Sequence, residues 1–133
     1  MTGIPEDVRA QIMAKARSEW PDDFEMQRHT LDSQINAYRE LQDLYGRLEL
    51  NDFVSEVFSS ALTEWADDYE MQLHKVKSQF GAASEFFSYE NSQVPDDVLE
   101  LIRSKAFREW PGDYEMQLHT LKNQVDAWLS LNV

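Results

Sequence analysis

A tryptophan recurs every 45 residues along this chain, at Trp20, Trp65 and Trp110. When the sequence is aligned with itself at that offset, eleven positions carry the same residue in all three segments. The segments cover about residues 1–45, 46–90 and 91–133, which is the whole sequence. Self-similarity at a fixed period of this length is the signature of repeat architectures. We therefore expect a single domain that consists of three internal repeats.

Each repeat has the pattern of two helices joined by a turn. In its first half, apolar residues recur every four positions, as on one face of an amphipathic helix. In the first repeat these are Val8, Ile12, Ala16 and Trp20. The second half carries a longer apolar stripe, which in the first repeat comprises Phe24, Leu31, Ile35, Tyr38 and Tyr45. Because no segment has a strand pattern, we predict an all-α fold of six helices in three helix-turn-helix hairpins, arranged either as a short solenoid or as a closed pseudo-threefold bundle.

Local signals mark the helix boundaries. Asp22 is followed three residues later by Glu25, which has the form of a capping box, and Asn51 is a capping residue in the second repeat. Gly46 and Asn91 are 45 residues apart and are residue types that readily adopt the left-handed conformation. We expect these two residues to end the second helix of the first two repeats.

The repeated tryptophans and glutamines each allow two interpretations. A tryptophan at the end of an apolar stripe is most often buried, so we expect burial at the hairpin corner, with an exposed aromatic ridge as the alternative. A buried glutamine must hydrogen-bond. The repeated glutamines are therefore expected to fix hairpin register, and a ladder of amides facing a ligand is the alternative. They are Gln27, Gln34, Gln72, Gln79, Gln117 and Gln124.

A glutamate precedes each repeated histidine by four residues. These histidines are His29, His74 and His119. This spacing could place a carboxylate and an imidazole on a metal ion or support acid-base chemistry, but it is also an ordinary helix-surface pair. Three identical pairs favour structure over catalysis, because an enzyme needs one asymmetric constellation. We expect no catalytic residues, no metal and no cofactor.

The charge is strongly acidic, with 25 acidic and 12 basic residues and a net charge of −13. Such a chain repels phosphate backbones and anionic membranes, so direct binding of nucleic acid or membrane is not expected. Acidic residues gather at the predicted turns. The candidate acidic edge is Glu19, Asp22, Asp23, Glu64, Asp67, Asp68, Glu109 and Asp113. Stacked hairpins would place these carboxylates on one edge, which suits a protein partner with a basic surface.

These features predict a non-enzymatic helical repeat protein that acts as an interaction or inhibitor module through its acidic edge. The alternative is a nucleic-acid mimic that occupies the basic groove of a DNA- or RNA-binding protein. A metal-binding protein that uses the glutamate-histidine pairs is a lesser alternative. Since residues 1–8 have neither a basic segment nor an apolar run, we expect a cytoplasmic protein. The sequence leaves the oligomeric state open.

Overall fold

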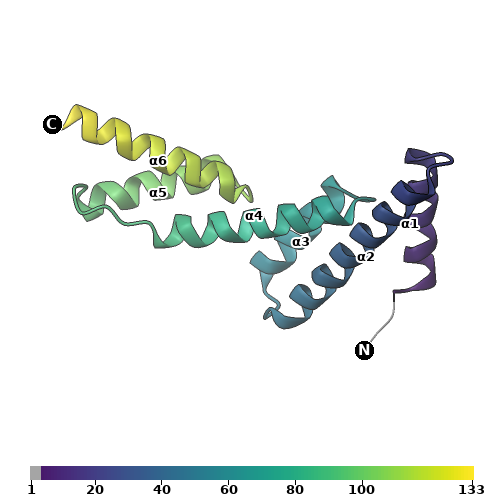
Figure 1. The fold of residues 1–133 in the computed structure, drawn as a ribbon. Helices are drawn as coiled ribbons and strands as arrows, with labels where there is room; N and C mark the ends of the chain where they lie inside the picture. The colour runs from purple at the N-terminus through teal and green to yellow at the C-terminus, as the bar shows by residue number, and fades with distance from the viewer. Residues whose placement is uncertain (1–3) are drawn as a thin grey trace. The chain divides into compact units, whose positions relative to one another are not determined.

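The computed structural model describes residues 4–133, and this range contains six α-helices and no strand, which confirms the predicted all-α class. The helices are α1 (Glu6–Glu19), α2 (Phe24–Arg47), α3 (Asp52–Glu64), α4 (Tyr69–Ser88), α5 (Asp96–Glu109) and α6 (Tyr114–Leu131) (Figure 1). None of the helices in this range is long and apolar enough to cross a lipid bilayer. The chain divides into two compact units, one ending at Val76 and the other running from Lys77 to Val133, with α4 contributing to both.

The first unit is built around the packed pair α1 and α2, followed by α3 and the start of α4 (Figure 1). Ala16 of the predicted apolar stripe and its counterpart in the second repeat, Ala61, are almost fully buried. The other buried apolar residues of this unit are Ile12, Ile35, Ala37, Leu41, Val54, Val57 and Val76. Burial of these small and branched side chains removes apolar surface from water and holds the helices together.

The second unit packs α5 against α6, with the end of α4 beside them. Its core comprises Phe86, Val94, Leu99, Ala106, Leu121 and Val125. Six partly buried apolar residues surround this core, among them Trp128 and Leu129 of α6. The Arg103 guanidinium donates to the backbone carbonyls of Phe86, at 3.2 Å, and Tyr89. It thereby supplies hydrogen-bond donors to the end of α4, where helix carbonyls lack partners.

The three turns that contain or follow a tryptophan share one hydrogen-bonding pattern. Each tryptophan amide donates to the alanine carbonyl four residues earlier, and an aspartate side chain caps the next helix. The capping residues are Asp23, Asp68 and Asp113. The predicted capping box on Asp22 is therefore wrong by one residue. Asp22 instead occupies the left-handed region, with φ of 64°, as does Gly112 with φ of 74°.

Gly46 and Asn91, which were predicted to end α2 and α4, lie close to the observed helix ends but do not adopt the predicted conformation. Gly46 lies inside α2, which ends at Arg47 and is followed by Leu48 in an extended conformation. Helix α4 ends at Ser88, before Asn91, whose side chain accepts the Gln93 amide at 2.9 Å. Neither Gly46 nor Asn91 has the positive φ that was expected. The chain leaves both helices through extended or turn residues instead.

Three apolar residues expected on buried stripes are exposed. Trp20 is 39% exposed, Phe24 74% and Tyr45 40%. Trp65 and Trp110 are partly buried, as expected for the hairpin corner. The prediction of burial is thus wrong for all three residues. The counterparts of Trp20 and Phe24 at the later turns are better covered.

Candidate protein-interaction site

We call residues 19–25, 64–70 and 109–115 the first, second and third turns. One repeated glutamine closes each turn from within its own hairpin. The Gln27 side-chain amide donates to the Trp20 carbonyl at 2.8 Å. Gln72 bonds Trp65 at 2.7 Å and Gln117 bonds Trp110 at 2.8 Å in the same way. All three glutamines are buried. Each of these glutamines therefore bonds the turn of its own hairpin, which is the kind of contact expected of a residue that fixes hairpin register.

Gln34 lies seven residues after Gln27 on α2 and binds the second turn. Its side-chain carbonyl accepts the backbone amide of Tyr69, the first residue of α4, at 2.7 Å. Its amide nitrogen donates to Asp68 at 3.0 Å and to Glu70 at 3.3 Å. Amides in the first turn of a helix have no partner within the helix, and acidic side chains gather there. A glutamine satisfies both with a single side chain.

Gln79 binds the third turn in the same manner, within the second unit. Its carbonyl accepts the amide of Tyr114, the first residue of α6, at 2.8 Å, and its nitrogen donates to Glu115 at 3.3 Å. Gln79 is 3% exposed. Two of the three turns are therefore recognised by a glutamine that comes 35 residues earlier in the chain.

Helix α1 adds a basic and a polar contact to the second turn. The Lys15 ammonium donates to the Asp67 carbonyl at 3.0 Å and lies 3.8 Å from an Asp68 carboxylate oxygen. The Gln11 amide donates to the Asp67 carboxylate at 2.5 Å, and the Tyr69 hydroxyl donates to the Gln11 carbonyl at 3.2 Å. The second turn is thus bound by amide and basic groups of α1 and α2, namely those of Gln11, Lys15 and Gln34.

These contacts shift the ionisation of two groups at the second turn. Partial burial alone would raise the pKa of Asp68, but the hydrogen bond from Gln34, the Met71 amide and the Lys15 charge outweigh it, and the pKa is lowered. Burial raises the pKa of Tyr69, and Tyr38 and Asp67 add to that rise. The hydrogen bonds and the nearby lysine therefore favour the charged form of the Asp68 carboxylate.

The predicted acidic residues fall into two groups. Those of the second turn have partners in the chain, since Glu64 pairs with Lys75 at 3.0 Å and both Asp67 and Asp68 are bound as described. Asp113 caps α6, and Glu109 is exposed at the third turn. At the first turn, Glu19, Asp22 and Asp23 are all exposed. Sequence reasoning missed the carboxylate partners Lys15 and Gln11, which lie more than 50 residues away from them.

The first turn resembles the other two in sequence but lacks the same covering. Phe24 occupies the place of Tyr69 and Tyr114, yet it is 74% exposed, whereas Tyr114 is 7% exposed. Asp23 caps α2 and remains exposed. Among residues 4–133, no glutamine takes the position at Phe24 that Gln34 takes at Tyr69. The first turn is therefore a helix end with an acidic and an aromatic surface facing solvent.

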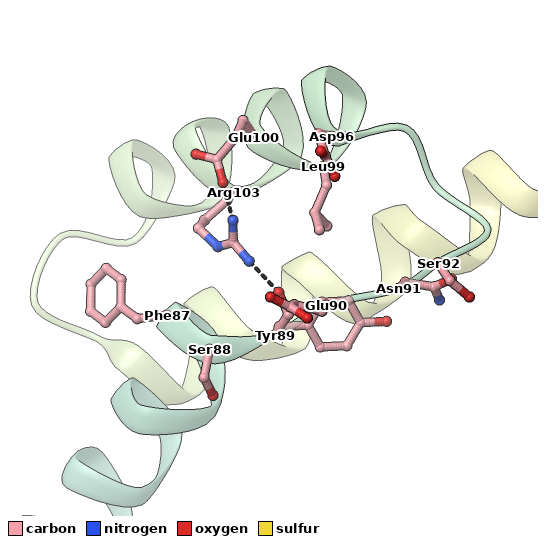
Figure 2. Close-up of a pocket in the computed structure, with 10 residues that line it drawn as sticks. All are labelled: Phe87, Ser88, Tyr89, Glu90, Asn91, Ser92, Asp96, Leu99, Glu100 and Arg103. Atoms are coloured by element: carbon pink, nitrogen blue, oxygen red, sulfur yellow. Dashed lines mark hydrogen bonds and ion pairs between the residues drawn. The ribbon is translucent and has the colours of Figure 1, made fainter.

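Two of the open pockets include residues of α4. One of about 590 Å³ is bordered by the end of α4 and by α5, where the Arg103 side chain binds Glu100 and the Tyr89 carbonyl (Figure 2). The other, of about 460 Å³, lies between α2 and α3 and includes Tyr45 and Phe58, whose rings meet edge to face. In the first pocket the Arg103 guanidinium donates its hydrogen bonds to groups of this chain.

The repeated histidines are exposed on their helices, and His119 lies 3.0 Å from the Asn123 side chain. Within the described range, histidines and acidic residues form no group of three or more that could hold a metal ion. The glutamates four residues before these histidines are also exposed, and two of them, Glu70 and Glu115, accept hydrogen bonds from Gln34 and Gln79.

Comparison with known proteins gave no match. The chain matches no protein family model. Neither a curated protein nor a solved structure shows significant similarity to it. The interpretation of the first turn therefore depends on its own geometry.

Proposed function

We propose that this protein is a non-enzymatic interaction module, made of three hairpin repeats, that binds a partner protein through its first turn. The observation that carries the proposal is the contrast between equivalent turns. The second and third turns are bound by a glutamine of the preceding hairpin. The first turn exposes the same kind of surface to solvent.

The contacts at the second turn indicate the chemistry that a partner would need. An amide group would bond the exposed helix amide and the carboxylates, as Gln34 does. A basic group would lie near Asp22 and Asp23, as Lys15 lies near Asp67 and Asp68. An apolar surface would cover Phe24. This combination favours a protein partner with a locally basic surface.

The same contacts give less support to a nucleic-acid mimic. A mimic presents its carboxylates outward at phosphate-like spacing, whereas Glu64, Asp67 and Asp68 bind groups of this chain. Lys122 likewise pairs with Glu85 at 2.5 Å. The first turn is therefore the part of the acidic edge at which all three carboxylates, those of Glu19, Asp22 and Asp23, face solvent.

The test is a binding measurement with two matched variants. A partner is captured from cells with wild-type protein and purified, and its affinity is then measured over a range of salt concentrations. Asp22→Asn with Asp23→Asn keeps side chains that tolerate a left-handed residue and an N-cap, so the fold is retained. We expect weaker binding and a smaller salt dependence, mainly through slower association.

The control variant removes two charges away from the turns. Glu49→Gln with Glu90→Gln alters exposed residues in the α2–α3 and α4–α5 connections. This variant should bind as the wild type does. A partner whose affinity is unchanged by the Asp22 and Asp23 substitutions would contradict the proposed function.

A further inference from the structure

The last hairpin exposes the groups with which the earlier hairpins bind a turn. At the 45-residue offset, Gln124 corresponds to Gln34 and Gln79, and Ala127 corresponds to Ala37 and Ala82. The earlier members of both sets are buried, whereas Gln124 and Ala127 are exposed. Leu131, the counterpart of the buried Leu41 and Phe86, is 84% exposed. We call Gln124, Ala127 and Leu131 the C-terminal face.

We infer that the C-terminal face of one chain binds the first turn of a second copy of the same chain, which assembles copies head to tail. This inference rests on the proposed function and names the partner. Within the chain, one kind of interface forms twice: Gln34 binds the second turn and Gln79 binds the third. The C-terminal face and the first turn correspond to the two sides of this interface. The new contact continues that established interface from one copy to the next.

The charges at the two surfaces are complementary. Lys105 on α5 occupies the position in the third repeat that Lys15 occupies in the first, and it is exposed. Lys15 lies near Asp67 and Asp68 in the second turn, and the first-turn counterparts of these residues are Asp22 and Asp23. In the assembly Lys105 of one copy therefore lies near Asp22 and Asp23 of the next. An opposite charge at this place offsets part of the repulsion between two acidic chains.

Two polar residues that contact each other within the chain have apolar counterparts at the proposed contact. Within the first unit, the Tyr69 hydroxyl bonds the side chain of Gln11. The counterparts at the proposed contact are Phe24, which has no hydroxyl, and Leu101, which is 59% exposed. Both partners of the hydrogen bond are thus replaced together by apolar residues. This joint change leaves no polar group unpaired and matches the first turn to the last hairpin of a second copy.

A head-to-tail contact uses two different surfaces, so it has a specific test. Phe24→Asp alters only the first turn, and Leu131→Asp alters only the C-terminal face. Each variant retains one intact surface, and both substitutions lie at exposed positions. Sedimentation equilibrium at physiological salt should show the mass of the wild type rising with concentration beyond that of a dimer, because a contact of this kind does not close on two copies.

Each variant alone should associate about tenfold more weakly or not at all, because a charge is buried against an apolar group. An equimolar mixture of the two should form a heterodimer that grows no further. Leu50→Asp adds the same charge in the α2–α3 connection and should associate as the wild type does. Circular dichroism and melting curves of each variant establish that it is folded.

The inference is overturned if the wild type stays monomeric at all concentrations, or if the mixture forms no heterodimer although both variants are folded. It is also overturned if each variant alone associates as strongly as the wild type. A monomeric protein that still binds a basic partner through Asp22 and Asp23 would leave the proposed function standing without the inference. Self-association without any such partner would support the inference.

Discussion

The side-chain carbonyl of Gln34 accepts the backbone amide of Tyr69 at 2.7 Å, across 35 residues of sequence. The same glutamine donates to Asp68 and Glu70. One side chain thus satisfies a helix N-terminus and the acidic groups beside it. Because Gln34 is only 4% exposed, water cannot easily replace these bonds.

Replacing Gln34 should therefore weaken the first unit. Gln34→Met keeps a similar volume but leaves the Tyr69 amide without its acceptor, and we expect a loss of about 1–3 kcal/mol in the free energy of unfolding. Chemical denaturation at low protein concentration measures this loss. Gln124→Met, at the exposed counterpart, should change stability by less than about 0.5 kcal/mol. Equal effects at the two positions would contradict the role assigned to Gln34.

Two glycines should respond to alanine with opposite signs. Gly112 has φ of 74°, a conformation that costs an alanine about 1 kcal/mol, so Gly112→Ala should destabilise. Gly81 lies inside α4, and nothing lies within 4 Å of an added Cβ. Gly81→Ala should therefore stabilise by about 0.5–1 kcal/mol. Thermal unfolding of both variants gives the comparison, and two shifts in melting temperature of the same sign would refute it.

Acid should reduce the stability that the Asp68 carboxylate contributes to the folded chain. Its pKa in the folded chain is lowered below the ordinary value of 3.8, so the charged carboxylate contributes stability at pH above that value. This contribution is lost as the pH falls through 3.8 toward the folded pKa. The difference in unfolding free energy between the wild type and Asp68→Asn should hence be constant near neutral pH and shrink below about pH 4.

Denaturation of both proteins over a pH series measures that difference. In a Gln34→Met background the acid-dependent part should be smaller, because Gln34 is the strongest of the groups that lower the pKa. A difference that stayed constant down to the lowest pH at which the protein folds would contradict the assigned role of the carboxylate.

Arg103 should be important for the end of α4. Its guanidinium bonds two backbone carbonyls and Glu100, and Arg103→Met should cost about 1–3 kcal/mol by leaving those groups unpaired. Arg103→Lys should restore little, because an ammonium lacks the planar fork that reaches several acceptors. Arg108→Met, at an exposed position of α5, is the matched control in chemical denaturation. A full rescue by lysine would show that charge alone matters.

Features that depend on residues close together in the chain could be predicted from the sequence. Helical periodicity predicted six helices, and the repeated residues located the three turns. Burial of Ala16, Ala61 and Ala106 followed from their place on an apolar stripe. The short-range bond from Gln27 to Trp20 also spans only seven residues, so its register could be foreseen from spacing along one hairpin.

Which copies of a repeated residue are buried depends on contacts between segments that are distant in the chain. Phe24 and Tyr114 have the same local surroundings, but Gln79 binds the turn of Tyr114, whereas in the described residues no such group lies at Phe24. Likewise, Asp67 is bound by Gln11 and Lys15 across more than 50 residues. Burial and ion pairing at these turns depend on a neighbouring hairpin, and a pattern within one repeat contains no information about whether that neighbour is present.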